Sequence, residues 1–256
     1  MSKRTRVSVI MPIHNEEEYL PCSLKSLKEI EDQIFEFIFV LDRCTDNSEN
    51  LVRQWFPAAK IIKKDVGKWR NPIAENFQIG FEASKGDVIC VHDADVTTPR
   101  NLLSLLEELK NDVACVSPTL FTCKEESFLN FLYYYWEKTR KIAPLGEQPM
   151  GALRLARRDC LEKVGGFKDV PAQDTQLDID LRKAGYQSII AKNVIHYHLR
   201  KFSFRKAIRG QIKDGRMRRQ IDMPFWRVLG HAILRLRPFV LCGYLLKKSA
   251  TSNRAV

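Results

Sequence analysis

The most informative absences in this 256-residue chain concern its cysteines. None of the seven forms a Cys-x-x-Cys pair, and their odd number does not fit a complete disulfide framework. Cys90 and Cys115 lie within apolar stretches, where a thiol behaves as a small hydrophobic group. This cysteine usage predicts a reduced, cytosolic compartment.

The sequence also shows no segment typical of targeting or of membrane crossing. Residues 1–6 are basic, but no apolar run with a cleavage site follows them, so we predict no signal peptide. The apolar stretch 225–246 is interrupted by three arginines, by His231 and by Pro238, which makes a bilayer-spanning helix expensive. The stretch fits a helix that lies at a membrane interface. An ordinary amphipathic helix packed against the rest of the protein is the alternative.

Excess positive charge is absent from the first 198 residues and concentrated in the last 58. Residues 199–256 contain 15 lysines and arginines against Asp214 and Asp222, a net charge of +13, whereas residues 1–198 carry −2 of the total of +11. A basic segment of this kind indicates an anionic partner, either a membrane surface or nucleic acid. We therefore expect residues 199–256 to form a basic, amphipathic helical extension.

What the chain does contain is a regular alternation of short apolar runs and helical patterns. Strands are predicted at residues 7–13, 35–41, 60–62, 88–91, 112–117 and 191–195. Helices are predicted to include residues 20–27, 50–56, 74–81, 97–109 and 157–164. This alternation predicts an α/β fold with a mostly parallel central sheet flanked by helices. In such sheets the ligand lies beyond the carboxyl ends of the strands.

Polar clusters stand at three of these carboxyl ends. Asp93 and Asp95 follow the strand at 88–91 with a spacing of two, so their side chains point the same way. Two carboxylates on one face suit a hard divalent cation that itself holds a phosphate, although a solvated Asp-Ala-Asp turn is the alternative. His14-Asn15-Glu16 and Asp42 end two other strands. The three clusters therefore converge on one edge of the predicted sheet.

Three segments resemble, in order and spacing, the family 2 glycosyltransferases of GT-A fold. They are Val-Ser-Val-Ile-Met-Pro-Ile-His-Asn-Glu-Glu from residue 7, Leu-Asp-Arg-Cys-Thr-Asp-Asn-Ser from residue 41 and Gly-Asp-Val-Ile-Cys-Val-His-Asp-Ala-Asp from residue 86. Gly165-Gly166-Phe167 and Gln173-Asp174 fit the acceptor half of the same family. The resemblance implies a catalytic domain at 1–198, with a Rossmann-like nucleotide-sugar-binding half at 1–96 and an acceptor half at 97–198.

The resemblance also implies the activity and the site. It implies transfer of a sugar, with inversion, from a nucleotide-sugar donor to an acceptor, dependent on Mg²⁺ or Mn²⁺ held by Asp93 and Asp95. The residues implied to bind the donor are Pro12, His14, Glu16, Asp42, Lys68 and Asp93. Asp42 would accept a hydrogen bond from the base, but Arg43-Cys44 replaces the family's Asp-Gly, which leaves the base open. Glu16 could instead only stabilise the first turn of a helix.

Two further positions belong to the later part of the chain. Asp174 matches the family's catalytic base, which takes a proton from the acceptor hydroxyl; if the acceptor is a phosphate, Asp174 would only orient it. His196 and His198 alternate on an extended segment and so share one face. A related pattern supplies one such histidine as a third metal ligand, and we assign this role to His196; a buried, hydrogen-bonded pair is the alternative. Asp178 is expected at the surface.

Other features of the sequence reduce the number of activities that we expect. The chain has no Gln-x-x-Arg-Trp run of the kind found in processive polysaccharide synthases, so we expect addition of a single sugar. A nucleotidyltransferase would need a glycine-rich, lysine-containing phosphate loop near the first strand, where Pro12-Ile13-His14-Asn15-Glu16 stands instead. A membrane or nucleic-acid binding module would explain only residues 199–256. We expect an enzyme peripheral to the cytoplasmic face of an anionic membrane, with a lipid-linked molecule among its candidate acceptors and without a nucleic-acid partner.

Overall fold

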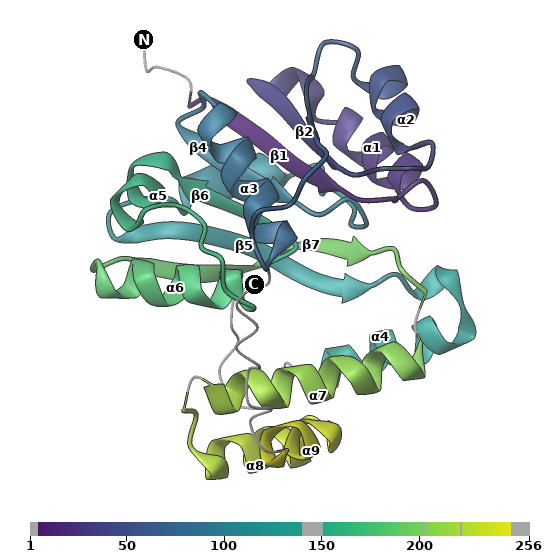
Figure 1. The fold of residues 1–256 in the computed structure, drawn as a ribbon, viewed down its shortest axis with the longest axis vertical. Helices are drawn as coiled ribbons and strands as arrows, with labels where there is room; N and C mark the ends of the chain where they lie inside the picture. Colours follow the sequence, from purple (N-terminus) through teal and green to yellow (C-terminus); the bar gives the residue numbers. More distant parts are fainter. Residues whose placement is uncertain (1–4, 140–150, 202, 221, 247–256) are drawn as a thin grey trace, which may run out of the picture. The chain divides into compact units, whose positions relative to one another are not determined.

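The structure is a computed structural model that describes residues 5–139, 151–201, 203–220 and 222–246 (Figure 1). Met150, which we had grouped with Gly151 and Ala152 as a small-residue segment for the acceptor, lies outside the described residues, as do residues 1–4. None of the helices in the described ranges is long and apolar enough to cross a membrane.

The described residues form a seven-stranded sheet with the order β3-β2-β1-β4-β6-β5-β7. The strands are β1 Val7–Ile13, β2 Glu36–Asp42, β3 Lys60–Lys64, β4 Val88–His92, β5 Val113–Thr122, β6 Leu153–Arg157 and β7 Gln187–His198. Strands β1 to β4 pair in parallel, β5 pairs in parallel with β7, and β6 runs antiparallel to both of its neighbours. The predicted α/β fold with a mostly parallel sheet is confirmed.

Helices cover both faces of this sheet (Figure 1). Those that accompany the sheet are α1 Leu20–Lys28, α2 Ser48–Trp55, α3 Pro72–Ala83, α5 Arg158–Val164 and α6 Gln173–Lys183, with short 3₁₀ helices η1 Glu31–Gln33 and η2 Leu102–Glu107. Alternate residues of β1 enter two different cores: Val9 and Met11 pack with α1 and α2, whereas Ile10 packs with α3, α5 and α6. Burial on both faces explains why the central strands are nearly continuous apolar runs.

Helix α3 begins as its sequence dictates. The side chain of Asn71 accepts a hydrogen bond from the backbone N–H of Ile73 at 3.2 Å, and Pro72 occupies the first helical position, where its missing N–H is harmless. This start places Glu75 and Asn76 in the first turns of the helix, where both side chains are buried. Their carboxylate and amide groups face the end of β2, as the site below shows.

The helix predicted over residues 97–109 is wrong in its extent. Only Leu102–Glu107 is helical, as the 3₁₀ helix η2. The segment before it stays extended because the backbone N–H of Thr97 donates to the carbonyl of Tyr197 at 2.9 Å, and that of Thr98 donates to Ser26 Oγ at 2.8 Å. Strand β6 was not predicted at all, and β7 is longer than the predicted strand at 191–195.

The chain divides by its internal contacts into two compact units. The first comprises Met1–Cys123 and Glu147–Arg200, and the second comprises Lys124–Gly146 and Lys201–Val256. The boundary after Arg200 lies close to the one expected after residue 198. The segment Lys124–Gly146, which the sequence analysis assigned to the acceptor half, groups with the C-terminal helices.

The second unit contains η3 Lys124–Glu126, α4 Phe128–Thr139, α7 Phe204–Gln220, α8 Phe225–Leu234 and α9 Phe239–Leu245. Helices α7 and α9 cross in close contact because each has a glycine at the crossing. A Cβ atom at Gly215 would lie 2.0 Å from the carbonyl oxygen of Val240, and one at Gly243 would lie 2.0 Å from that of Ile212. The backbones could not approach this closely with any larger residue.

Candidate active site

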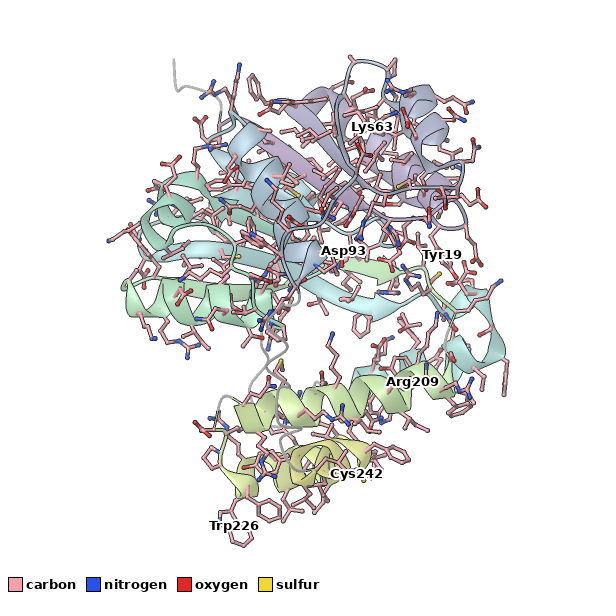
Figure 2. The ribbon with its side chains drawn as sticks, viewed as in Figure 1. Tyr19, Lys63, Asp93, Arg209, Trp226 and Cys242 are labelled. Carbon is pink, nitrogen blue, oxygen red and sulfur yellow. The ribbon has the colours of Figure 1, made fainter. Side chains whose placement is uncertain are left out.

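The site is organised by Asp93 and Asp95, which follow β4 directly (Figure 2). The backbone N–H of Asp93 donates to the carbonyl of Ala152 at 2.8 Å, next to the start of β6. The backbone carbonyl of Asp95 accepts from the N–H of Leu199 at 2.8 Å, just after β7. Because the loop is bonded on both sides, the two carboxylates are held at the edge of the sheet where the predicted clusters converge.

Negative charge accumulates around Asp93. Its pKa is raised well above the ordinary value, first by burial and then by the nearby carboxylates of Asp95, Asp174 and Glu16. The structure therefore brings together four acidic side chains that the sequence analysis placed in the site. Carboxylates crowded in this way repel one another unless a positive group joins them.

One positive group comes from a residue that the sequence analysis did not single out. The guanidinium of Arg200, just beyond β7, donates through Nε to Asp95 Oδ2 and through Nη2 to Glu16 Oε1. The same guanidinium lies over the ring of Tyr19, 5.2 Å from its centroid. Arg200 thus links the loop after β4 to the loop after β1.

Of the two candidate histidines, the structure brings His198 to the carboxylates. Its Nε2 lies 3.4 Å from Asp95 Oδ2, and burial is the largest of the effects that lower its pKa. The predicted ligand His196 is fully buried within the same strand, where burial lowers its pKa to about 3. Both histidines share a face as expected, but the one level with Asp95 is the one at the end of the strand.

The side chains at this edge are of the types that ligate a divalent metal, although they are not arranged around one. Within the described ranges, no three His, Cys, Asp or Glu side chains are gathered as a ready metal site. Asp93 and Asp95 offer the oxygen ligands that Mg²⁺ and Mn²⁺ prefer, and the neutral imidazole of His198 is a further group able to ligate a metal. Arg200 holds Asp95 toward Glu16 and occupies the Oδ2 oxygen of Asp95.

Asp42, the residue expected to contact the base, lies in a buried charge network. Arg43 Nε lies 2.7 Å from its Oδ1, while Lys64 Nζ and Asn76 Nδ2 lie 2.9 and 3.1 Å from its Oδ2. Burial alone would raise the pKa of Asp42, but the hydrogen bonds from these three groups outweigh it and lower the pKa. Lys64 also pairs with the buried Glu75 at 3.0 Å. The Asp42 carboxylate is therefore held ionised and in one orientation.

Other predicted donor-binding residues lie close to this network. The Nδ1 of His14 donates to the carbonyl oxygen of Asp42 at 2.6 Å. The backbone N–H of Lys68 donates to Glu75 Oε1 at 2.7 Å, while the side chain of Lys68 is exposed. Pro12 is half-buried on β1, which runs beside β2. His14 therefore contacts the end of β2, and the backbone of Lys68 joins the same network through Glu75.

The loops after β1 and β2 are tied to each other. Asn15, in a left-handed conformation with φ of 54°, accepts a hydrogen bond on its side-chain oxygen from the N–H of Thr45 at 2.7 Å. The carboxylate of Asp46 accepts from the N–H groups of Ser48 and Glu17, each at 3.0 Å. Asp46 therefore has a structural role, since its carboxylate joins the two loops.

Asp174 lies in the first turn of α6 and faces the segment before β6. A Cβ atom at Gly151 would lie only 2.8 Å from Asp174 Oδ2, so glycine permits this approach. Below it, the buried Arg154 of β6 reaches both the carboxylate of Asp178 and the backbone oxygen of Asp174. The expectation that Asp178 lies at the surface is wrong, because its carboxylate compensates this buried arginine.

The sequence analysis missed His198 as a neighbour of the carboxylates, together with several charged and polar residues of the networks around Asp95, Asp42 and Asp178. The residues not anticipated are Arg200, Lys64, Glu75, Asn76 and Arg154. The alternating His-Tyr-His run contained the signal for His198. No local pattern marks the others, because the ion pairs and side-chain hydrogen bonds cited for them join residues 11 or more positions apart in the sequence.

The mostly parallel sheet, with helices on both faces and acidic groups at its carboxyl edge, defines an α/β domain. The family model described as glycosyl transferase family 2 matches residues 8–165, and the chain belongs to this family. The resemblance found in the sequence is thereby confirmed. The match also argues against the nucleotidyltransferase and binding-module alternatives.

The curated relatives are longer than this chain. The probable glycosyltransferase YdaM of Bacillus subtilis (strain 168) is 30% identical over 213 residues, which cover 73% of this chain and 49% of that protein. The undecaprenyl-phosphate 4-deoxy-4-formamido-L-arabinose transferase of Proteus mirabilis (strain HI4320) is 32% identical over 107 residues, covering 38% and 31%. The chain thus spans about half the length, or less, of these relatives.

Solved structures share the fold. The mannosyltransferase PcManGT from Pyrobaculum calidifontis, in complex with GDP-Man and Mn²⁺, superposes with a TM-score of 0.65 at 22% identity, covering 94% of this chain and 74% of that one. Glucosyl-3-phosphoglycerate synthase from Mycobacterium tuberculosis, with Mn²⁺, UDP and phosphoglyceric acid, superposes with a TM-score of 0.59 at 18% identity, covering 82% and 76%. The GT-A fold expected from the sequence is confirmed.

Proposed function

We propose that this chain is a metal-dependent, inverting glycosyltransferase that adds a single sugar from a nucleotide-sugar donor to an acceptor. The observation that carries the proposal is the gathering of Glu16, Asp93, Asp95 and Asp174 at the carboxyl edge of the sheet. Three of these acids come from the loops after β1 and β4, and the fourth begins α6. This arrangement supplies separate groups for the donor diphosphate and for the acceptor.

In this proposal the nucleoside lies at the end of β2, against Pro12, His14, Asp42 and Lys68. The ionised Asp42 is suited to accept a hydrogen bond from an N–H group of the base. The solved relatives were crystallised with GDP-Man or UDP, which supports a nucleotide-sugar donor without selecting the base. Arg43, where the family pattern has Asp, also borders this pocket through its bond to Asp42.

The diphosphate end of the donor would lie against Asp93 and Asp95. These carboxylates, with an imidazole from His198 or the originally assigned His196, would hold Mg²⁺ or Mn²⁺. When bound, the ion supplies positive charge that stabilises the departing nucleoside diphosphate. The Mn²⁺ in the solved relatives supports this choice of metal.

Asp174 would serve as the general base. Its carboxylate takes the proton of the acceptor hydroxyl, and the acceptor oxygen forms a bond to the anomeric carbon. The bond from that carbon to the diphosphate oxygen breaks, and the nucleoside diphosphate leaves with the electron pair. A single displacement of this kind inverts the anomeric configuration. If the acceptor is a phosphate, it is already ionised near neutral pH and Asp174 orients it.

We further propose that the acceptor is lipid-linked and is met at the cytoplasmic face of an anionic membrane. Similarity to undecaprenyl-phosphate transferases supports such an acceptor. Exposed basic residues on α7, together with exposed apolar residues on α8, on α9 and in the turn between those two helices, support binding to a membrane surface. They are Arg205, Lys206, Arg209, Lys213, Arg216, Trp226, Ile233, Leu234, Leu236 and Leu245. Each basic residue near an anionic leaflet contributes roughly 1 kcal/mol.

A donor panel tests the proposal. The full chain is incubated with individual nucleotide sugars, Mn²⁺ and polyprenyl phosphate in detergent, and the released nucleoside diphosphate is quantified. Release from one donor, lost with chelator and in Asp93→Ala and Asp95→Ala but kept in the control Asp32→Ala on η1, is the expected result. Release that survives chelator or persists in either aspartate variant would contradict the metal assignment.

A further inference from the structure

The position of Arg200 carries an inference about how the carboxylate site behaves without a cation. Its side chain is 37% exposed, whereas the side chains of its partners Asp95 and Glu16 are only 9% and 15% exposed. The guanidinium therefore reaches from the solvent side into a largely buried acidic cluster. Both bonds join a guanidinium to a carboxyl group, the pairing that gives charge-assisted hydrogen bonds stronger than neutral ones.

Geometry explains why this contact requires an arginine. The two carboxylates belong to different loops, after β4 and after β1, and the fork of one guanidinium bonds both at once. The ring of Tyr19 lies against the guanidinium, with its centroid 5.2 Å away. A lysine ammonium would keep the charge but would lack this planar fork.

We propose that Arg200 is an internal counter-ion that competes with the divalent cation for Asp95. In the cation-free protein the guanidinium offsets part of the negative charge of Asp95 and Glu16 and holds the two loops together. When a cation takes Asp95, Arg200 leaves that carboxylate and turns to the donor diphosphate, whose oxygens match the same fork. The inference rests on the proposed function in taking Asp95 as a cation ligand and the donor as a nucleotide sugar with a diphosphate.

The exchange has a thermodynamic consequence. Without nucleotide, a cation that binds Asp95 through Oδ2 takes the oxygen that Arg200 holds and leaves the guanidinium without that partner, so cation affinity is held down. With a nucleoside diphosphate present, the displaced guanidinium gains new oxygen partners, so the two ligands strengthen each other's binding. Arg200 thereby favours loading of the site with cation and donor together.

Mn²⁺ binding to the full chain in the absence of nucleotide tests this competition. Calorimetric titrations would compare wild type with Arg200→Gln, Arg200→Lys and the control Arg100→Gln, which removes an exposed arginine paired with Glu29 at 2.7 Å. We expect Arg200→Gln to bind Mn²⁺ about tenfold more tightly, which corresponds to about 1.4 kcal/mol. Arg200→Lys should show a smaller gain, and Arg100→Gln none.

Thermal unfolding in chelator gives a second readout that needs no metal. Arg200→Gln should unfold at a lower temperature than Arg100→Gln, because its carboxylates have lost their counter-ion. Mn²⁺ should then raise the unfolding temperature of Arg200→Gln by more than it raises that of wild type. Equal or weaker Mn²⁺ binding in Arg200→Gln would overturn the competition. An unfolding temperature equal to that of Arg100→Gln would overturn the counter-ion role.

A reference variant separates this inference from the proposed function. If Asp95→Asn binds Mn²⁺ as tightly as wild type does, Asp95 is not a ligand and the proposed metal site itself is wrong. If Asp95→Asn abolishes binding while neither Arg200 variant tightens it, the metal site stands and the competition is wrong. Should Arg200→Gln fail to fold, Arg200→Lys gives the same comparison with the charge retained.

Discussion

Arg154 Nη2 lies 2.8 Å from Oδ1 and 2.9 Å from Oδ2 of Asp178, and Arg154 is only 2% exposed. The pair joins β6 to α6 in the interior of the first unit. Arg154 Nη1 also lies 3.4 Å from the backbone oxygen of Asp174, in the first turn of the same helix. A buried ion pair thus fixes the helix that presents the proposed base.

Asp178→Asn should destabilise the protein by about 3 kcal/mol or more, because it leaves the Arg154 charge buried without its anionic partner. Asp159→Asn is the matched control, since Asp159 also pairs with an arginine, Arg157 at 2.6 Å, but its side chain is 63% exposed. The control should lose less than about 1 kcal/mol. Urea unfolding measures both, and equal losses would show that burial of the pair contributes nothing.

Asp174→Asn should lower the turnover rate by about 10²- to 10⁴-fold, because an amide cannot accept the acceptor proton. Donor affinity, measured by calorimetry with the nucleoside diphosphate and Mn²⁺, should change little. Near-normal turnover would point to a phosphate acceptor or to another base.

Gly151→Ala should reduce turnover with little effect on donor affinity. The new methyl group would lie 2.8 Å from Asp174 Oδ2 and would push that carboxylate from its place. Gly210→Ala on α7 is the control, because a Cβ there meets no atom within 4 Å. Steady-state kinetics with varied acceptor would separate the two. Unchanged kinetics in Gly151→Ala would mean that the position of Asp174 tolerates the shift.

Acidification should destabilise the protein through histidines that are buried in their neutral form. Burial, followed by nearby arginines led by Arg218, lowers the pKa of His231 from 6.5 to about 4. The unfolded chain therefore takes up a proton near pH 6.5, whereas the folded chain does so only near pH 4. This contribution to stability is complete above pH 6.5 and is lost as the pH falls toward 4.

His231→Gln should therefore lose less stability than wild type between about pH 7 and about pH 5. The remaining loss has the same sign, since burial also lowers the pKa of His92 to about 4 and that of His196 to about 3. Thermal unfolding followed by circular dichroism at both pH values provides the measurement. A variant with the full wild-type sensitivity would show that His231 is protonated in the folded state.

Anionic vesicles should carry the full chain upward in a flotation gradient, and high salt should release it, because surface charge attraction is screened. Trp226→Glu on α8 should reduce flotation, since this side chain is 77% exposed and projects outward (Figure 2). Val66→Glu is the control in the first unit, where Val66 is 71% exposed. Protein that stays at the bottom with anionic vesicles would refute the membrane proposal.

The central strands could be predicted because of where they lie. Strands β1, β2 and β4 are covered on both faces, so nearly every residue is apolar and the run is visible in the sequence. Strand β6 is also buried, but Leu153-Arg154-Leu155-Ala156-Arg157 includes two arginines. Its burial depends on Asp178, a partner on α6 that no local pattern reveals.

The acidic residues of the site could be predicted from the sequence, whereas the histidine that lies beside them could not. Asp93 and Asp95 follow an apolar strand, and the period of two fixes their common direction. The same period puts His196 and His198 on one face but does not say which lies beside Asp95. That depends on where β7 ends, which the hydrogen bond from Leu199 to Asp95 and the bridge between Val96 and His198 determine.

The order of the sheet determines when each strand can find its neighbours during synthesis. Strands β1 to β4 are contiguous in the sheet and can pair as soon as residue 92 has been made. Strand β5 is made next, but it lies between β6 and β7 and is separated from β4 by β6. One side of β5 can pair only after Leu153–Arg157 of β6 has been made, and the other side only after the end of β7 has been made. Until then β5 is an open strand edge, the place where an unfinished chain is most exposed to pairing with a neighbour.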